Sequence, residues 1–216
     1  KARERVPAPV RRVGLELKEA WRTMFHPFDG FYRIKGRKLS VGTLLALLTL
    51  LAGAKTASLY WTGFIFHPYN LDRIEPAQEL LRLLAPLAAW VVANYLVSTG
   101  KDGEGRFRDV LQSSLFALAP YIALTPLTIA LSRLLVLEEG ILVSSLETAT
   151  WLWCGALLLV SSQVAHNFEF VENLRNSAIT VVTIGILFLF VAATAGLTYN
   201  LSDFIYQLYK EATLLG

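Results

Sequence analysis

Three ionisable side chains lie within stretches of sequence that are otherwise apolar: Lys55, Arg82 and Glu147. A charged group is costly inside a lipid bilayer, and the charges found there usually pair with one another or serve a function. We therefore expect an intramembrane charge cluster in which Glu147 pairs with Lys55 or Arg82. The alternative is that each side chain extends separately towards the nearest layer of lipid headgroups. The sequence is compatible with both interpretations.

Other residue types that commonly carry chemistry do not form a recognisable site. His26, His67 and His166 fall at different ends of the apolar stretches, so we do not expect them to share a metal ion. The sequence lacks the His-Glu-x-x-His pattern of helical zinc sites and the Gly-x-Ser-x-Gly pattern of a nucleophilic serine. Its single cysteine, Cys154, excludes a disulfide within the chain. We expect no catalytic residue, cofactor or metal, and therefore no enzyme.

A polar, glycine-rich segment covers residues 100–105 between two apolar stretches. It lacks the Gly-Lys-Ser/Thr ending and the preceding strand of a phosphate-binding loop. We interpret it as a tight turn at one face of the membrane. Its charged residues and their neighbours, Asp102, Glu104, Arg106 and Arg108, are expected to contact lipid headgroups or a protein partner.

The composition points to a membrane protein. Of the 216 residues, 54% are hydrophobic and 17% are charged, whereas soluble domains average roughly 45–50% and about 25%. A chain of this size cannot bury so much apolar surface in water, which argues against a soluble α/β enzyme and against disorder. The net charge of +3 is too small to indicate nucleic-acid binding.

Five apolar stretches are long enough to cross a bilayer, which takes about 20 helical residues. They lie at residues 40–61, 80–98, 110–132, 143–166 and 178–198. These runs are long and show no strict alternation, which argues against strands. The expected fold is all-α: a polytopic integral membrane bundle of five transmembrane helices with an amphipathic interfacial helix at the N-terminus.

Positive charges predict the orientation, because Lys and Arg concentrate on the cytoplasmic side of membrane proteins. Residues 1–38 hold eleven of the 20 Lys and Arg. We therefore expect a cytoplasmic N-terminus and an extracytoplasmic C-terminus. The chain divides into a basic leader (1–38), a five-helix domain (39–200) and a short amphipathic tail (201–216).

The leader has apolar residues at helical spacing between residues 13 and 28, with Lys18, Trp21 and Arg22 among them. This pattern is typical of a helix that lies on an anionic membrane surface, with Lys18, Trp21 and Arg22 at the inner leaflet. A helix that packs on a partner or on another domain would show the same pattern. Near the other end, an apolar pattern in residues 201–209 either forms a separate amphipathic segment or continues the fifth helix.

Five short motifs, in order around the five apolar stretches, resemble the bacterial branch of the Ypt/Rab-interacting-protein (YIP) domain family. They are Met24–Tyr32, Tyr60–Phe66, Asp102–Phe107, Ala117–Tyr121 and Leu137–Gly140. The resemblance implies a non-enzymatic five-span protein in the bacterial inner membrane. Eukaryotic members bind prenylated small GTPases, but here a short basic leader replaces their long acidic segment, which argues against a GTPase partner.

The bacterial branch implies an association with carbohydrate ABC importers. We therefore expect an accessory or scaffold subunit that contacts the lipid bilayer, the permease subunits and the ATPase of such an importer. Small residues provide the expected contact faces: Gly155, Ala156, Gly185, Ala192, Ala193 and Gly196. The alternative is an autonomous small-solute transporter or channel. Few polar residues lie at mid-depth, so this alternative requires a polar cavity between the spans.

Overall fold

The chain is helical throughout the part that can be described. The computed structural model describes residues 8–66, 75–101 and 103–214. Within these residues no strand occurs, as expected. The elements are α1 (Ala8–Phe25), α2 (Pro27–Ile34), α3 (Val41–Trp61), the 3-10 helix η1 (Phe64–Phe66), α4 (Pro76–Thr99), α5 (Phe107–Ala117), α6 (Ala119–Leu134), the 3-10 helix η3 (Leu137–Glu139), α7 (Gly140–His166) and α8 (Phe170–Leu214).

Five helical segments are long and apolar enough to cross a membrane, which confirms the expected bundle. They are Val41–Trp61, Pro76–Thr99, Phe107–Leu134, Leu137–His166 and Phe170–Glu211. The third consists of α5 and α6, which meet at Leu118. Pro120 follows this break and lies in the first turn of α6, where a missing backbone N–H is tolerated.

Local sequence signals explain where the spans begin. Ser40 caps α3, because its hydroxyl accepts a hydrogen bond from the backbone nitrogen of Thr43 at 3.1 Å. Pro76 occupies the first turn of α4. This start lies four residues before the start expected at residue 80, and it brings Glu79 into the span. The last helix also exceeds its expected length, because α8 continues without a break to Leu214.

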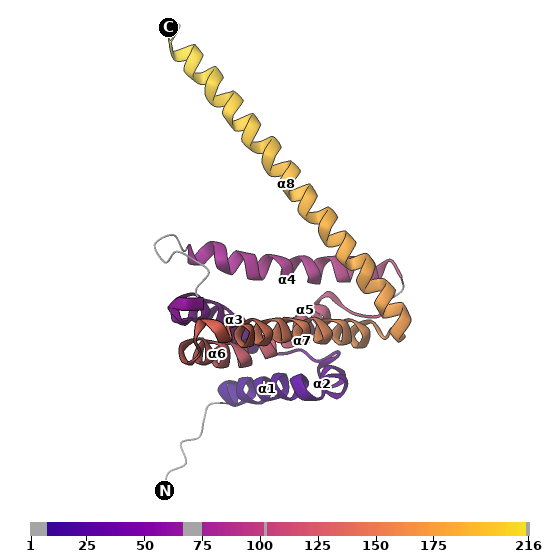
Figure 1. The fold of residues 1–216 in the computed structure, drawn as a ribbon. Helices are drawn as coiled ribbons and strands as arrows, with labels where there is room; N and C mark the ends of the chain where they lie inside the picture. The colour runs from indigo at the N-terminus through magenta and orange to yellow at the C-terminus, as the bar shows by residue number, and fades with distance from the viewer. Residues whose placement is uncertain (1–7, 67–74, 102, 215–216) are drawn as a thin grey trace.

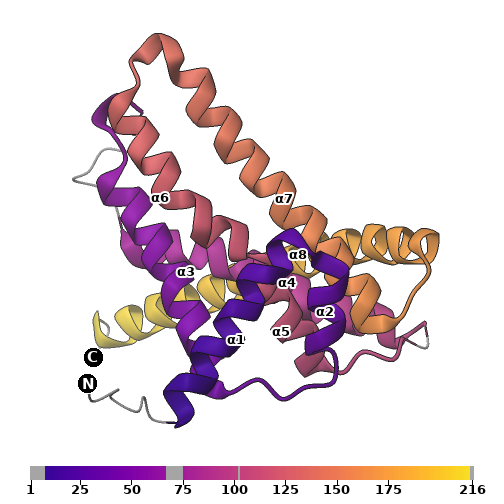
Figure 2. The same cartoon turned by 90° about the horizontal axis from the view of Figure 1, so that it is seen from below.

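The spans run back and forth between two ends of the bundle. The end that carries residues 35–41, 100–101 and 103–106, here called the leader end, includes the ion pair between Lys35 and Glu104. At the opposite, distal end, Arg133 Nε donates a hydrogen bond to the carbonyl oxygen of Trp61. Figure 1 shows α1 and α2 below the layer that contains α6 and α7, with α4 above it. Viewed from below in Figure 2, α1 crosses the direction of α7.

The best-packed part of the bundle lies towards the leader end, where α2, α3, α5 and α7 meet. Phe31 of α2, Leu47 of α3, Phe116 of α5 and Leu157 of α7 belong to one buried apolar cluster. The crossing of α1 and α2 is very close, because a Cβ on Gly30 would lie only 2.8 Å from the Cα of Thr23. Glycine at position 30 is therefore what permits the leader to fold back on itself.

The last helix separates from the rest of the chain. Near its start, α8 packs mainly on α4 and also on α7. The later part of α8 rises away from the bundle (Figure 1), and every residue from 188 to 211 is exposed. A 45-residue helix is about 67 Å long, more than twice the roughly 30 Å of the hydrocarbon core of a bilayer.

Candidate functional site

The charged groups of the first two spans form one buried cluster. Lys55 Nζ of α3 lies 3.0 Å from Glu79 Oε2 of α4, and the Arg82 guanidinium pairs with the other oxygen of the same carboxylate. Glu79 is almost completely buried, with 7% of its side chain exposed, whereas 64% of the Arg82 side chain is exposed. One carboxylate therefore holds two cations, and this cluster (Lys55, Glu79 and Arg82) is called the ion triad below.

The structure corrects the expected partner of the two cations. The pairing carboxylate is Glu79, not Glu147, which forms no ion pair with a described residue. The physical reason is the position of α4, which starts at Pro76 and so places Glu79 within the helix, 3.0 Å from Lys55. The sequence does contain a feature that could have identified Glu79. It lies three residues before Arg82 in a helix that a proline begins, and residues three apart lie on one face of a helix.

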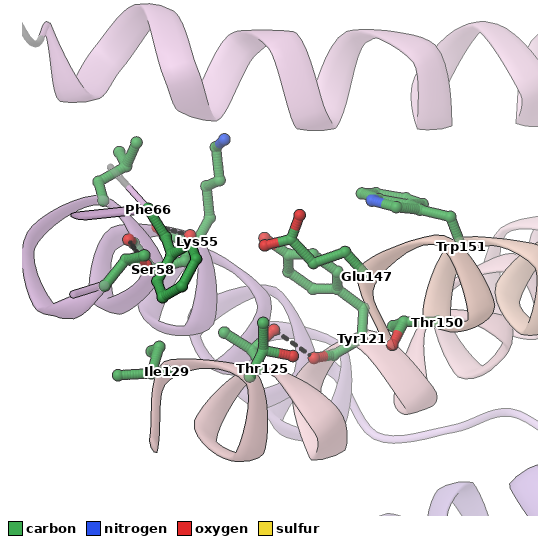
Figure 3. Close-up of a pocket in the computed structure, with 12 residues that line it drawn as sticks. Lys55, Ser58, Phe66, Tyr121, Thr125, Ile129, Glu147, Thr150 and Trp151 are labelled. Carbon is green, nitrogen blue, oxygen red and sulfur yellow. Dashed lines mark hydrogen bonds between the residues drawn. The ribbon is translucent and has the colours of Figure 1, made fainter. Parts of the chain in front are cut away.

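A polar cavity of about 320 Å³ lies beside the ion triad. It is lined by Lys55, Ser58, Leu59, Thr62, Phe66, Tyr121, Thr125, Thr128, Ile129, Glu147, Thr150 and Trp151. Figure 3 shows the Glu147 carboxylate entering this cavity from α7, whereas the Lys55 ammonium points towards α4. Glu147 is exposed and faces the cavity across from Lys55.

The serine and threonine hydroxyls of the polar cavity share one arrangement: each donates its proton to a backbone carbonyl of its own helix. Thr125 donates to Tyr121 at 2.6 Å and Thr150 donates to Leu146 at 2.7 Å. Ser58, Thr62 and Thr128 do the same. Thr62, Thr128 and Thr150 keep their oxygen lone pairs available, so these hydroxyls and the Glu147 carboxylate present hydrogen-bond acceptors to the cavity. Ser58 and Thr125 also interact with the Tyr121 hydroxyl.

A second cavity, of about 390 Å³, lies on the other side of Lys55 and is mainly apolar. Its lining residues are Lys55, Arg82, Leu83, Pro86, Leu87, Trp90, Leu118, Tyr121, Trp151, Leu158 and Ile184. The two cavities share Lys55, Tyr121 and Trp151. Tyr121 and Trp151 contact each other, with ring centroids 5.1 Å apart.

At the leader end, buried polar side chains join the spans. Asn94 of α4 donates to the hydroxyl of Ser162 at 2.9 Å, and its amide oxygen lies 3.0 Å from His166 Nε2 of α7. Asn176 of α8 donates to the hydroxyl of Ser98 of α4 at 2.8 Å. Apolar side chains gain little from leaving lipid for protein, so such polar contacts help to hold membrane helices together.

The glycine-rich loop packs directly on this polar network. A Cβ on Gly105 would lie 2.7 Å from the imidazole ring of His166 and 3.0 Å from the carbonyl oxygen of Ala165. Glycine is required at position 105 because the loop backbone covers the end of α7. The loop therefore covers the side chain of His166.

The charged residues expected to contact lipid or a partner, in and after the glycine-rich loop, do not all have the same surroundings. Glu104 pairs with Lys35 of the leader at 3.8 Å, and Arg108 lies 3.9 Å from Asp109 on its own helix. Arg106 precedes α5 and is exposed. Asp102 lies outside the described residues. Glu104 and Arg108 therefore have partners within the chain, and Arg106 and Glu104 are both exposed at the surface.

The leader helix places its charged and aromatic residues on an outer face. Lys18, Trp21 and Arg22 are exposed, whereas the other face of α1 buries Ala20 and Met24 against the protein. This geometry suits a helix at a membrane surface. The contact of these residues with the inner leaflet stays a prediction.

A carboxylate anchors the leader helix to the first span. Glu16 of α1 accepts hydrogen bonds from Ser40 and from the Thr43 hydroxyl at the start of α3, and from Arg12. Partial burial raises the pKa of Glu16, but the hydrogen bonds from Thr43, Arg12 and Ser40 outweigh this effect and lower the pKa below its ordinary value. The anchoring carboxylate is therefore ionised at neutral pH.

These helices define a multi-pass α-helical membrane protein whose charged cluster lies within the spans. Residues 21–193 match the Yip1 domain, and the chain therefore belongs to the Yip1 domain family, as the resemblance predicted. Members of this family are generally non-enzymatic. In the part of the chain that the structure describes, no group of His, Cys, Asp and Glu could hold a metal ion. No curated protein and no solved structure matches the chain.

Proposed function

We propose that the protein is a non-enzymatic scaffold of the bacterial inner membrane, an accessory subunit that binds the permease subunits of a carbohydrate ABC importer. The observation that supports a scaffold role is that α8 separates from the other helices, so that residues 188–211 are exposed on all sides. The side chains of residues 188–208 are exposed on all sides of this helix and are available to other membrane proteins. The importer follows from the resemblance to the bacterial branch of the family.

Small residues on α8 support contact with another helix. Ala192 and Gly196 lie one turn apart on the same face, with Ala193 beside them, and a Cβ on Gly196 would meet no other atom. Such spacing lets two helix backbones approach closely in a membrane. Gly155 of α7 likewise faces open space, so a second small-residue face is available.

The outer face of α1 supports a second contact, at the membrane surface. With the cytoplasmic N-terminus that the positive charges predict, Lys18, Trp21, Arg22 and Arg106 lie on the side of the membrane where an importer holds its ATPase. The same surface binds anionic lipid in the absence of a partner.

The test is purification of the tagged native protein in a mild detergent, followed by mass spectrometry of the proteins that accompany it. We expect two permease subunits and an ATPase in near-equal amounts. The variant Gly196→Leu should release them, because its side chain blocks close approach of a partner helix. Thr194→Leu lies on the opposite face of α8 and should retain them. Recovery of the protein alone would contradict the importer assignment.

A second function, small-solute transport, is favoured by one observation: the polar cavity between the spans that holds Glu147 and Lys55. The test is uptake of radiolabelled sugars and amino acids by liposomes that contain the purified protein alone. Uptake that is lost in Glu147→Gln would establish transport. Uptake equal to that of empty liposomes would exclude it for these solutes.

A further inference from the structure

The polar cavity, lined mainly by α3, α6 and α7, and the apolar cavity, lined mainly by α4 with α7 and α8, adjoin one another and are together called the cleft below. The closest neighbours of α4 are α8, α5 and α3, and its contacts with α7 are few. The two cavities meet at Lys55, Tyr121 and Trp151, so the cleft changes from polar to apolar at one place. A ligand that fits this cleft must itself have a polar and an apolar part.

The apolar part of the cleft is long enough to hold a section of an acyl chain. It follows α4 from Arg82 to Trp90, and these residues lie about 12 Å apart along a helix axis. Apolar side chains line it, among them Leu83 and Leu87 of α4 and Ile184 of α8. An acyl chain that moves from the bilayer into this cavity exchanges one apolar environment for another, so it loses no favourable solvation.

The charged side chains that line the apolar cavity are both cations, Lys55 and Arg82. Arg82 gives one contact to Glu79, and most of its side chain is exposed. A guanidinium has five N–H donors in a planar arrangement that matches phosphate. The entrance of the apolar cavity therefore favours an anionic group that accepts several hydrogen bonds.

The polar part of the cleft requires the opposite chemistry. Its serine and threonine hydroxyls have already donated their protons to helix carbonyls, and Glu147 has no ion-pair partner among the described residues. These acceptors are satisfied by a ligand that brings N–H or O–H donors. A quaternary ammonium group, which has none, would leave them unmatched.

We propose that this cleft binds one phospholipid whose headgroup carries hydrogen-bond donors, such as phosphatidylethanolamine. The phosphate contacts Arg82 and Lys55, the donors of the headgroup bond to Glu147, and one acyl chain fills the apolar cavity. Arg82 and Lys55 each lie six residues, about 9 Å, inside the distal ends of α4 and α3. Both side chains are long enough to extend from this depth towards the headgroups on the distal side.

The test measures binding by the purified full chain in detergent, with native mass spectrometry and thermal unfolding as readouts. The probes are phosphatidylethanolamine and phosphatidylcholine with the same acyl chains, and glycerophosphoethanolamine, which has no chains. We expect phosphatidylethanolamine to bind about tenfold more tightly than phosphatidylcholine, which corresponds to 1.4 kcal/mol. Glycerophosphoethanolamine should not bind. Equal binding of the two lipids, or equally tight binding of the chain-free headgroup, would overturn the proposal.

Matched variants locate the site. Arg82→Gln should weaken phosphatidylethanolamine binding about tenfold, whereas Arg133→Gln, at the same end of the bundle but outside the cleft, should leave it unchanged. Ile184→Trp fills the apolar cavity and should prevent binding, whereas Ile186→Trp, on an exposed part of α8, should not.

Glu147→Leu should abolish the preference for phosphatidylethanolamine over phosphatidylcholine, because the variant side chain accepts no hydrogen bond from the ethanolamine ammonium group. Unchanged preference in this variant, or equal weakening by Arg82→Gln and Arg133→Gln, would contradict the proposed site. The lipid preference of the unaltered protein needs no variant, so the proposal stays testable if a variant fails to fold.

Discussion

The carboxylate of Glu16 accepts a hydrogen bond from the backbone nitrogen of Ser40 at 3.0 Å, and this bond joins α1 to the residue that caps the first span. The start of a helix favours negative charge, because its first backbone N–H groups are unpaired and its dipole is positive there. Glu16 therefore adds to the cap formed by Ser40 and fixes the leader helix against α3.

Glu16→Gln should destabilise the protein by about 1–2 kcal/mol at neutral pH, because charge-assisted hydrogen bonds become neutral ones. The pKa of Glu16 is lowered on folding, so its contribution is full above the ordinary value of 4.5 and disappears as the pH falls through the lowered value. Thermal unfolding from about pH 6 to about pH 3 measures this. The difference between the two proteins should shrink with acidity; a constant difference would contradict the role of the charge.

Glu79→Leu should be strongly destabilising, by about 3 kcal/mol, because Lys55 then stays in the span without its partner. Thermal unfolding in detergent measures the loss. The control is Glu75→Leu, an exposed carboxylate four residues earlier, which should change the stability little. Adding Lys55→Met to Glu79→Leu should restore most of the stability, and the absence of such rescue would show that the pair is not the source of the effect.

Gly105→Ala should destabilise the leader end by about 1–3 kcal/mol, because the added methyl group would meet the imidazole ring of His166 and the carbonyl oxygen of Ala165. Gly53→Ala provides the control: nothing lies within 4 Å of its added Cβ, and it is inside α3. This control should be neutral or stabilising by up to about 1 kcal/mol. Equal melting temperatures for both variants would argue against the close packing of the loop.

Asn94→Leu should cost about 2 kcal/mol, because Ser162 and His166 would lose their shared hydrogen-bond partner in a buried place. Hydrogen exchange should show faster exchange at the ends of α4 and α7 near this network. The matched change Asn200→Leu, on an exposed part of α8, should leave exchange in α4 and α7 as it was. Unaltered exchange in Asn94→Leu would mean that the network does not join these helices.

Hydropathy predicts the five spans well because each span needs a long apolar stretch. It predicts their limits less well. Glu79 interrupts the apolar run at the start of α4, although Pro76 already begins the helix, and the polar residues after Asn200 do not end α8. A helix continues beyond the lipid as long as its turns keep forming backbone hydrogen bonds. Hydropathy measures apolar composition only, so it cannot predict where such a polar extension ends.

The candidate site is harder to predict because it depends on how the helices are rotated about their axes. Lys55 and Arg82 were identified as intramembrane charges, but the choice of Glu79 over Glu147 is decided by which face of α4 meets α3. The same holds for Asn94 and His166, which lie 72 residues apart in the chain. Such pairs follow from packing between helices, and periodicity within one helix does not specify them.

The attachment of α8 gives it a mechanical property. Residues 170–184 hold its base, where Asn176 bonds to Ser98 and Asn173 bonds to the carbonyl oxygen of Leu159, whereas residues 188–211 are exposed. A stiff rod fixed at one end acts as a lever. The part of α8 beyond residue 184 is about 45 Å long, so a rotation of about ten degrees at its base displaces its far end by about 8 Å. Small changes around Asn176 are therefore amplified into large displacements of the C-terminal turns.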